Sequence, residues 1–363
     1  MNTIIFLGAG ASKADNAPLQ KDLFKDYFLS DYYKKSHNEM DNELRTFFYF
    51  IFGIDVDSIE DDIIFPTFEE ALGILDLAIM RGESLKNYDR INVACNSNRL
   101  GYIRNHLIFL MAKIIEISLD NHNYFHSLLV ENLYNEGLLS NVDFLSTNYD
   151  ILIDNAISHL LMNLHYDNYR NNHFGDSIDY GITNIDYINS VGWEKPTDNS
   201  IKLYKIHGSL NWLYCPACND IKITPNRKGV IDLINEPQRA LCHNCEELLL
   251  PIIVPPTYYK DMSNTALNTI WNKSEYLLRN AKHIVFCGYS FPDADMHIKY
   301  LLKRIETNRK LPLQVTVINH FNGKDDWICK DEENRYNRFF RTPVNYVKDC
   351  SFQDFAKHPE NYI

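Results

Sequence analysis

Five short apolar runs in this chain are each followed by a glycine or a polar residue, and this feature restricts the fold more than any other. The runs cover residues 3–7, 142–146, 201–206, 283–287 and 315–318, and helical patterns lie between them. Strands that alternate with helices predict an α/β fold with a doubly wound, mostly parallel sheet. Such sheets bind ligands at the carboxyl ends of their strands, so the residues that follow the runs are expected to share one site.

The first run leads into a glycine turn, Gly8-Ala9-Gly10-Ala11-Ser12, and a helical pattern resumes around Leu19 and Phe24. Glycine lets a backbone approach a pyrophosphate, and the helix that follows offers free N–H groups and a positive dipole end. The full dinucleotide fingerprint Gly-x-Gly-x-x-Gly is absent, because Lys13 stands in place of the third glycine. The turn therefore predicts either a nucleotide site or a tight strand-to-helix connection without a ligand.

Two later strand ends carry side chains suited to catalysis. Asn148 and Asp150 follow the run 142–146. An asparagine amide can both donate and accept, and an aspartate can cap a helix or hold a ribose hydroxyl, so a ligand site and a plain helix cap are both open. His207 follows the run 201–206 and precedes a glycine, which makes it a candidate base among the 13 histidines of the chain.

Two Cys-x-x-Cys pairs form the most specific motif. Cys215 and Cys218 make the first pair and Cys242 and Cys245 the second, with residues 219–241 between them. This spacing matches a zinc ribbon in which four thiolates hold Zn²⁺ tetrahedrally. A closed shell of thiolates leaves no position for water, so the Zn²⁺ is expected to be structural. His243 is a weaker alternative ligand, and four unbound thiols are the remaining interpretation.

Residues 30–130 show helical rather than strand periodicity. Phe68, Leu72 and Leu75 recur at helical spacing behind a Thr67-x-x-Glu70 capping box. We expect one domain over residues 1–363 with three parts. They are a Rossmann-like core of 1–29, 131–212 and 251–363, a helical insertion of 30–130, and a zinc-ribbon module of 213–250. Val315–Ile318 is expected to be the last strand, and Lys330–Arg341 to be solvated surface.

Charge and composition narrow the partners. A net charge of −12 gives little reason to expect direct binding to nucleic acid, which requires clustered Lys and Arg. The sequence contains neither a secretory signal pattern nor the roughly 18 consecutive apolar residues of a membrane span. Four of the eight cysteines fall in the two pairs, which suits metal binding in a reducing compartment. A cytoplasmic protein without a membrane segment is expected.

The order of these motifs resembles the sirtuin (SIR2) family. More narrowly, it is similar to the SIR2-like branch found in bacterial anti-phage defence. The narrower resemblance rests on four segments, Ala17-Pro-Leu19, Ser146-Thr-Asn-Tyr-Asp150, His207-Gly-Ser-Leu-Asn-Trp212 and Gly288-Tyr-Ser-Phe-Pro-Asp293. The resemblance implies a Rossmann-like sheet and a site for NAD⁺ as substrate.

The resemblance also implies a role for each residue that matches the family pattern. Asn148 and Asp150 are expected to hold the nicotinamide ribose and a water molecule, and His207 to be the catalytic base. The pyrophosphate is expected to be lined by Gly8, Ala9, Gly10 and Ser12. The adenosine side is expected to contact Gly288, Ser290 and Asn319.

Two departures from the protein-deacylating sirtuins favour a different reaction. Those enzymes carry a Gly-Ile-Pro-Asp-Phe-Arg segment after the glycine turn and a peptide-pairing Phe-Gly-Glu strand after the zinc module. Here the corresponding segments are Asp15–Gln20 and Pro255–Lys260. Because Pro255 and Pro256 have no backbone N–H, pairing with a peptide is weakened. The sequence thus predicts an NAD⁺ glycohydrolase that depletes NAD⁺ in anti-phage defence.

Two other functions remain open, an NAD-dependent protein-lysine deacylase and a non-enzymatic module that binds NAD or ADP-ribose. An enzyme that depletes NAD⁺ has to be kept inactive until it is triggered, and the sequence shows no obvious second domain that would act as a sensor. A homo-oligomer or a partner protein, such as a defence-associated ATPase, is therefore expected.

Overall fold

The chain forms two compact units. Met1–Ala17 and Asn121–Ile363 make the first unit, and Pro18–Asp120 makes the second. The computed structural model describes residues 2–36, 39–60, 62–85, 91–92, 97–119, 123–166, 177–183, 185–186, 193–224, 229–231, 240–254, 264–319 and 323–363.

A seven-stranded parallel sheet forms the centre of the first unit, in the order β13-β12-β11-β1-β4-β7-β5. Leaving out the edge strand β5, the chain visits the strands in the Rossmann order and reverses direction at β1. The predicted doubly wound α/β sheet is therefore confirmed. The strands are β1 (Thr3–Leu7), β4 (Val142–Ser146), β5 (Ile178–Asp179), β7 (Ile201–Lys205), β11 (His283–Cys287), β12 (Gln314–Ile318) and β13 (Val344–Val347).

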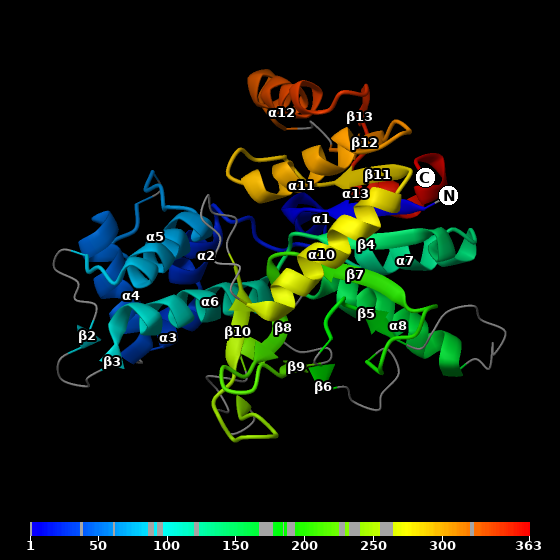
Figure 1. The fold of residues 1–363 in the computed structure, drawn as a ribbon. Coiled ribbons are helices and arrows are strands. Elements are labelled where there is room, and N and C mark those ends of the chain that lie inside the picture. The colour runs from blue at the N-terminus through cyan, green and yellow to red at the C-terminus, as the bar shows by residue number, and fades with distance from the viewer. Residues whose placement is uncertain are drawn as a thin grey trace. The chain divides into compact units, whose positions relative to one another are not determined.

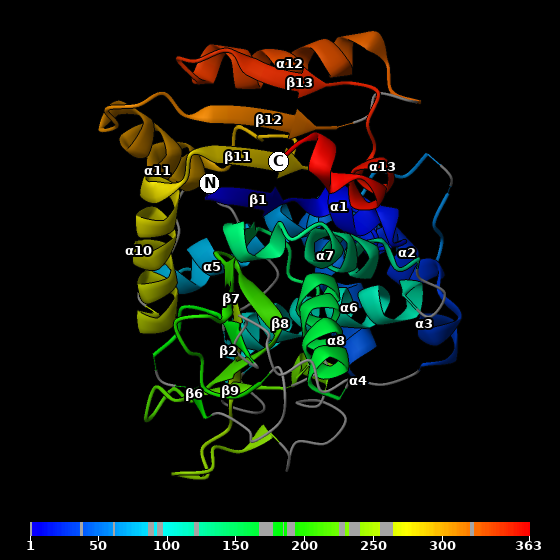
Figure 2. The ribbon, with the colours of Figure 1, turned by 90° about the vertical axis from the view of Figure 1, so that its right-hand side faces the viewer.

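Helices cover both faces of this sheet (Figures 1 and 2). α7 packs on α8 and α13 on one side, and α10 packs on α11 on the other. Strands β1, β4 and β11 are buried along their whole length, which explains why they are nearly continuous apolar runs. The helices are α1 (Ala9–Ala14), α7 (Phe125–Asn135), α8 (Leu152–Tyr166), α10 (Thr265–Asn280), α11 (Met296–Thr307), α12 (Asp326–Phe339) and α13 (Phe352–Lys357), with 3-10 turns η2 (Leu139–Asn141) and η4 (Pro359–Asn361).

Asp15 joins the two chain segments of the first unit. Its carboxylate accepts the backbone N–H groups of Phe125 and His126 at 2.8 and 3.1 Å, and it also contacts the His126 ring. The side chain is buried, and it satisfies donors at the start of α7 that have no partner within the helix. Residues 1–17 are thereby held to the point where the chain returns to this unit.

A second sheet in the first unit has the order β10-β8-β9-β6. β8 (Gly208–Tyr214) runs antiparallel to both β9 (Ile221–Ile223) and β10 (Leu250–Ile253), and β6 (Ile185–Asp186) pairs with β9. β10 thus lies in this sheet and not in the seven-stranded one. The sequence analysis missed β8, which begins directly after His207.

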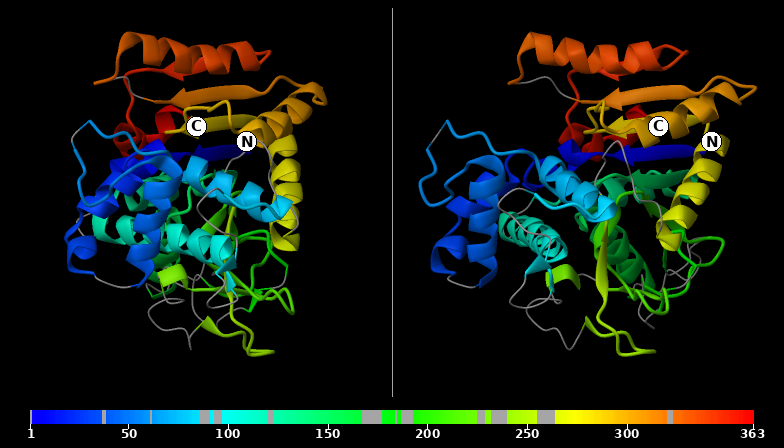
Figure 3. Two further views of the ribbon diagram at one scale, coloured as in Figure 1. Left: turned by 90° about the vertical axis from the view of Figure 1, so that its left-hand side faces the viewer. Right: turned by 60° about the vertical axis from the view of Figure 1, so that its left-hand side comes forward.

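The second unit is built from helices, drawn blue to cyan in Figure 3. Phe24, Phe28, Phe48 and Phe65 pack ring against ring in its core. The predicted capping box at Thr67 is present. Its elements are α2 (Leu23–Leu29), α3 (Asp31–Lys35), α4 (Glu39–Phe47), the π-helix η1 (Phe48–Phe52), α5 (Phe68–Arg81), β2 (Ile91–Asn92), β3 (Ser97–Asn98) and α6 (Arg99–Ser118).

Three sequence interpretations need correction. The expected glycine turn is largely helix α1, which begins at Ala9, directly after Gly8. The helical pattern around Leu19 and Phe24 belongs to a second helix, α2, which begins at Leu23. β12 is not the last strand, because Val344–Val347 pairs with it as β13. The stretch 330–341 is not simply solvated, since it includes most of α12, whose Glu332 and Tyr336 are buried. An amphipathic helix with a charged outer face produced the polar pattern. None of the described helices is long and apolar enough to cross a membrane.

Candidate active site

The carboxyl ends of β1, β4 and β7 lie next to one another in the sheet. Leu7 pairs with Ser146, and Ser146 pairs with Lys205. Asn148 and His207 each follow their paired residue by two positions, so they lie at the same edge on neighbouring strands. β1 is the strand at which the chain reverses direction, and this is where open α/β sheets bind ligands.

Asn148 connects the first two strand ends through its side chain. Its amide nitrogen donates to the Gly8 carbonyl oxygen at 2.9 Å and to Ser12 Oγ at 2.8 Å. Both amide protons are used, and the carbonyl partner fixes which end of the amide is nitrogen. The side chain is only partly buried. What Asn148 offers to a ligand is therefore its amide oxygen, a hydrogen-bond acceptor.

Asp150 is held from both sides. Ser12 Oγ donates to its Oδ2 at 2.6 Å, and the N–H of Leu152 donates to its Oδ1 at 3.0 Å. Leu152 is the first residue of α8, so Asp150 caps this helix. Both Ser12 and Asp150 are buried. Of the two interpretations that the sequence left open for Asp150, its contacts correspond to the helix cap.

The glycines after β1 and β11 pack backbone against backbone. Gly10 N–H donates to the Gly288 carbonyl oxygen at 2.8 Å, and Gly8 N–H donates to that of Cys287 at 2.9 Å. A Cβ at Gly288 would lie 2.1 Å from the nitrogen of Ala11, and φ at Gly288 is +62°. Glycine is needed here so that two turns can touch. The close packing agrees with the tight strand-to-helix connection that the sequence left open beside a nucleotide site.

His207 lies at the junction between the two sheets. Its backbone carbonyl accepts the N–H of Val254, and its ring lies 6.3 Å from the ring of Tyr149. Gly208 has a φ of +90°, and a Cβ there would lie 1.9 Å from the Ile252 carbonyl oxygen. Only glycine allows the chain to turn from β7 into β8 against β10. The imidazole Nε2 lies 3.9 Å from Asp295 Oδ1, and both side chains are almost completely buried.

A buried ion pair supports this turn. Lys205 Nζ donates to Asp154 Oδ2 at 2.9 Å, to Ser209 Oγ at 2.6 Å and to the backbone carbonyl of Asp150. All three ammonium protons therefore have partners, as a buried Lys requires. Tyr180 donates to the other oxygen of Asp154 at 2.7 Å. The pKa of Tyr180 is raised, mainly by its burial and then by the nearby Asp154. Lys205 thus links the end of β7 to α8, to the loop after β4 and to the start of β8.

The other two predicted contact regions lie after β11 and β12. Asn319 is buried, and its amide nitrogen donates to the Tyr289 carbonyl at 3.1 Å and to Glu332 Oε1 at 2.5 Å. Ser290 is exposed, and its carbonyl accepts from Arg335 at 3.1 Å. Asn319, like Asn148, thus has its amide nitrogen turned to the protein.

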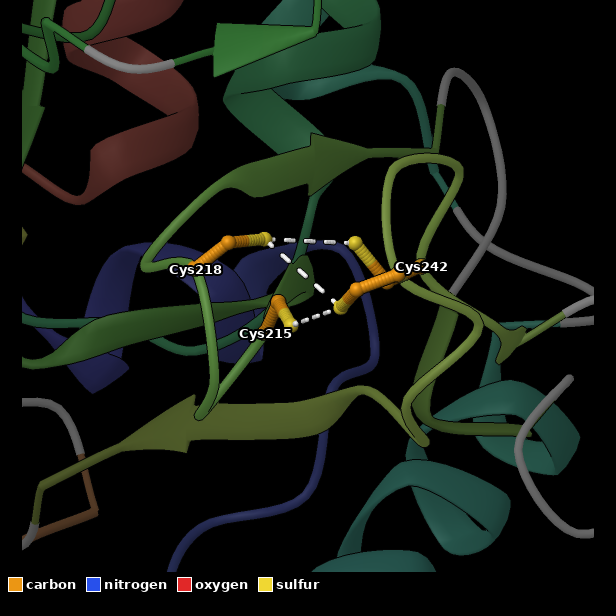
Figure 4. A group of neighbouring side chains, drawn as sticks. Cys215, Cys218 and Cys242 are labelled. Atoms are coloured by element: carbon orange, nitrogen blue, oxygen red, sulfur yellow. Dashed lines mark hydrogen bonds between the residues drawn. The ribbon is translucent and has the colours of Figure 1, made fainter.

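The four paired cysteines gather at the ends of β8, β9 and β10. Their sulfur atoms all lie within 4.8 Å of one another. Sγ of Cys215 is 3.4 Å from that of Cys245, and Sγ of Cys218 is 3.4 Å from that of Cys242. Figure 4 shows Cys215 and Cys218 facing Cys242. A tetrahedron of sulfurs around Zn²⁺ has edges of about 3.8 Å, so these side chains fit a structural zinc ion.

Both cysteine pairs have the same backbone geometry. In the first, Cys215 N–H donates to Asp220 O and Asn219 N–H donates to Cys215 O. In the second, Cys242 pairs with Glu247 and Glu246 in the same way, with φ values of +61° at Asn219 and +59° at Glu246. Two copies of one local turn, facing each other, present four thiols to one point. His243 is exposed on this turn, outside the sulfur cluster.

A family model described as "SIR2-like domain" matches residues 142–339, more than half of the chain. The protein belongs to this family. The match includes β4, β7, β11 and β12 with the residues that follow them, and the cysteine module. It therefore covers the predicted catalytic residues Asn148 and His207, and it places the chain in the sirtuin superfamily.

Solved sirtuin structures resemble the chain over nearly its full length. They include Sir2 bound to an acetylated peptide (15% identity, 99% of this chain and 93% of that chain covered, TM-score 0.40). Others are Sir2Tm bound to a propionylated peptide (13%, 99% and 93%, 0.39) and Sir2 with a p53 peptide and NAD⁺ (14%, 99% and 93%, 0.39). At these TM-scores the likeness adds nothing to the family assignment. A search of the curated proteins finds no match.

Several buried charged residues of this SIR2-like domain escaped the sequence analysis, among them Lys205, Asp295 and Glu332. Lys205 carries a usable signal, because a lysine inside the apolar run 201–206 needs a buried partner. Asp295 lies in a polar loop, and Glu332 lies in a helix with a charged outer face. Nothing in their local sequence separates them from solvated acids.

Proposed function

We propose that this SIR2-like domain is an NAD⁺ glycohydrolase that yields nicotinamide and ADP-ribose. The observation that carries the proposal is the placement of Asn148 and His207 at one sheet edge, beside the strand where the chain reverses. Membership of the SIR2-like family supports NAD as the substrate.

In the proposed reaction, the glycosidic bond between nicotinamide and ribose breaks and its electron pair leaves with nicotinamide. The leaving group departs as a neutral molecule because the pyridinium ring of NAD⁺ is cationic. A water molecule attacks the oxocarbenium-like ribosyl carbon and loses a proton. NAD⁺ and water thus give nicotinamide, ADP-ribose and one proton.

Asn148 and His207 have separate tasks in this reaction. The amide oxygen of Asn148 accepts a hydrogen bond from the attacking water or from a ribose hydroxyl, because its nitrogen is held by Gly8 and Ser12. His207 accepts the proton, since an imidazole with an unperturbed pKa near 6.5 can act as a base at neutral pH. The four cysteines would hold Zn²⁺ in a closed shell of thiolates, where the ion would stabilise the second sheet and take no part in the reaction.

Hydrolysis is favoured over protein deacylation by the sequence at residues 255–260, which lies outside the described residues. Pro255 and Pro256 have no backbone N–H to offer an acylated peptide. The cysteine module and the His207 strand end are shared with either activity, so they do not distinguish the two. Deacylation remains the second candidate, with non-enzymatic binding of NAD or ADP-ribose as the third.

One assay separates these candidates. Purified protein is incubated with NAD⁺, with and without an acetyl-lysine peptide, and the products are separated by chromatography. A glycohydrolase releases nicotinamide and ADP-ribose without peptide, a deacylase needs the peptide, and a binding module shows binding by calorimetry without turnover.

Variants then assign the residues. Asn148→Ala and His207→Ala are expected to slow nicotinamide release by about 100- to 10,000-fold, the usual effect of losing a positioned acid–base group. His159→Ala is the control, because His159 is exposed on α8. Unchanged release by either site variant, with the fold retained by thermal melting, would contradict the assignment.

An enzyme that depletes NAD⁺ must also be kept inactive until it is needed. We propose that the protein works in the cytoplasm as an anti-phage effector, in a homo-oligomer or with a partner such as a defence-associated ATPase. Size-exclusion chromatography combined with the NAD⁺ assay tests the assembly. A fully active lone monomer would count against it.

A further inference from the structure

We propose that Asp295 is a positioning residue for His207 and that Tyr289 holds Asp295 in place. The proposal rests on the proposed function, because it assigns a role in preparing the base for NAD⁺ cleavage. Asp295 lies in the loop between β11 and α11, far from His207 in the sequence. The tertiary structure brings the two side chains together.

The geometry is that of an aspartate facing an imidazole. Asp295 Oδ1 lies 3.9 Å from His207 Nε2, and the exposed fractions of the two side chains are 3% and 2%. Tyr289 Oη donates to the other carboxylate oxygen, Oδ2, at 2.6 Å, and Tyr289 is itself buried. The tyrosine therefore fixes the carboxylate from one side while its second oxygen faces the imidazole.

The position of Asp295 in α11 supports this role. Asp295 is the N-cap residue of this helix, yet its side chain makes no capping hydrogen bond. An N-cap aspartate ordinarily accepts an N–H from the first turn. Here the carboxylate is directed to Tyr289 and His207 instead, while the positive end of the α11 dipole still favours its negative charge.

The chemistry follows from charge. An imidazole that takes a proton becomes a cation, and a buried carboxylate at this distance stabilises that cation and raises the pKa of the base. It also favours one orientation of the ring, with Nε2 toward Asp295. The same division of tasks between aspartate and histidine operates in serine hydrolases.

Other described polar groups near His207 direct their polar atoms to other partners. The Tyr149 ring lies 6.3 Å away, and its hydroxyl donates to the Val254 carbonyl at 3.3 Å. Lys205, two residues before His207 on β7, directs its ammonium group to Asp154. Asp150, after β4, accepts from Ser12 and Leu152. Asp295 is thus the carboxylate that the described residues place against the imidazole.

The test is the pKa of the His207 imidazole, measured by NMR on the full chain without substrate. The His207 signal is identified by its loss in His207→Gln. Asp295→Asn is expected to lower this pKa by about one unit or more, because an opposite charge within about 4 to 6 Å shifts a pKa by that amount. Asp295→Ser, which keeps a good N-cap residue without the charge, is expected to do the same and covers the case in which the asparagine variant does not fold.

Asp293→Asn is the matched control. Asp293 lies in the same loop, but its side chain is 63% exposed and pairs with Lys299 and Arg338. This variant is expected to leave the pKa of His207 unchanged. If Asp295→Asn and Asp293→Asn give the same His207 pKa as the parent, Asp295 serves only to anchor its loop and the proposal is wrong.

Kinetics add a second readout. In Asp295→Asn, kcat for nicotinamide release is expected to fall at least tenfold with little change in KM, and the acid limb of the pH profile to move about one unit lower. If the parent releases no nicotinamide, the glycohydrolase proposal fails, while the NMR titration still decides the pairing of Asp295 with His207. A changed pKa with unchanged kcat and pH profile would overturn the positioning role.

Discussion

The sheet edge and the cysteine module reach a defined geometry in different ways. At the edge, Ser12, Asn148 and Asp150 come from two separate strand ends and hold one another by hydrogen bonds. In the module, four thiols face one point with sulfur separations as short as 3.4 Å. The edge is organised by protein contacts alone, whereas the module gathers groups that are suited to bind an ion.

One strand connects the two regions. β8 begins at Gly208, directly after His207, and ends at Tyr214, directly before Cys215. Its seven residues span about 24 Å at the usual rise of a strand. A structural ion at one end of β8 would therefore secure the strand that begins beside the proposed base. The comparison teaches that the module and the sheet edge are connected through the backbone of one strand.

Removal of the metal is expected to have the largest effect. Binding of zinc to a structural thiolate site contributes on the order of 10 kcal/mol, so chelation or Cys218→Ser should unfold the module and lower the melting temperature. Because β8 begins beside His207, nicotinamide release should fall as well. Calorimetry and zinc analysis provide the measurement. His243→Ala, an exposed residue outside the sulfur cluster, should retain the metal.

Lys205→Met breaks the support of the edge without touching the module. The change leaves Asp154 buried without its cation, and loss of one partner of a buried pair costs about 3 to 5 kcal/mol. Urea unfolding measures the loss, and the zinc content should stay at the parent's value. The double variant Lys205→Met/Asp154→Leu should recover much of the stability. A single variant as stable as the parent would show that the pair does not support the edge.

Acid is expected to weaken the sheet that carries the edge. Burial lowers the pKa of His283, the first residue of β11, to about 4. Since the folded-state pKa lies below the unfolded value of 6.5, the native state binds fewer protons between these values. Stability is full above pH 6.5 and decreases as the pH falls toward 4, by at most about 3 kcal/mol for this group.

Thermal melts from pH 7 to pH 4 measure this dependence. His283→Gln can keep a hydrogen bond to Thr316, which lies 2.8 Å from the histidine Nε2, and cannot titrate. The variant should lose less stability than the parent over this range. Equal slopes for the two proteins would remove His283 as a source of the acid sensitivity.

The smallest effect concerns the backbone of the module. Glu246 occupies the left-handed region with a φ of +59°, where glycine is favoured over other residues. Glu246→Gly is expected to raise the stability of the module by about 0.5 to 1 kcal/mol, measured as resistance to loss of zinc. The adjacent Glu247→Gly is the control and should bring no gain, because its φ is not positive. Asn219 already suits the matching position of the other turn.

Much of the fold followed from residues that are close in the sequence. The runs at 3–7, 142–146 and 283–287 became buried parallel strands, since parallel strands covered on both faces are continuously apolar. The doubly wound parallel sheet and the gathering of the four cysteines were likewise predicted. β13 and β8 were not predicted. Val344–Val347 is short and partly exposed, and Gly208–Tyr214 carries the buried polar residues Ser209 and Asn211, so it is not a continuous apolar run.

The sequence by itself determined which side chains follow which strands, because a strand's period and a Cys-x-x-Cys spacing are local properties. Only the tertiary structure decided what those side chains do with their hydrogen bonds. It turned the amide nitrogens of Asn148 and Asn319 toward the protein, set Gly8 and Gly10 against Gly288, and brought Asp295 to His207. Apart from those of Asn319, these pairings join residues more than 80 positions apart, so only packing of distant segments selects them.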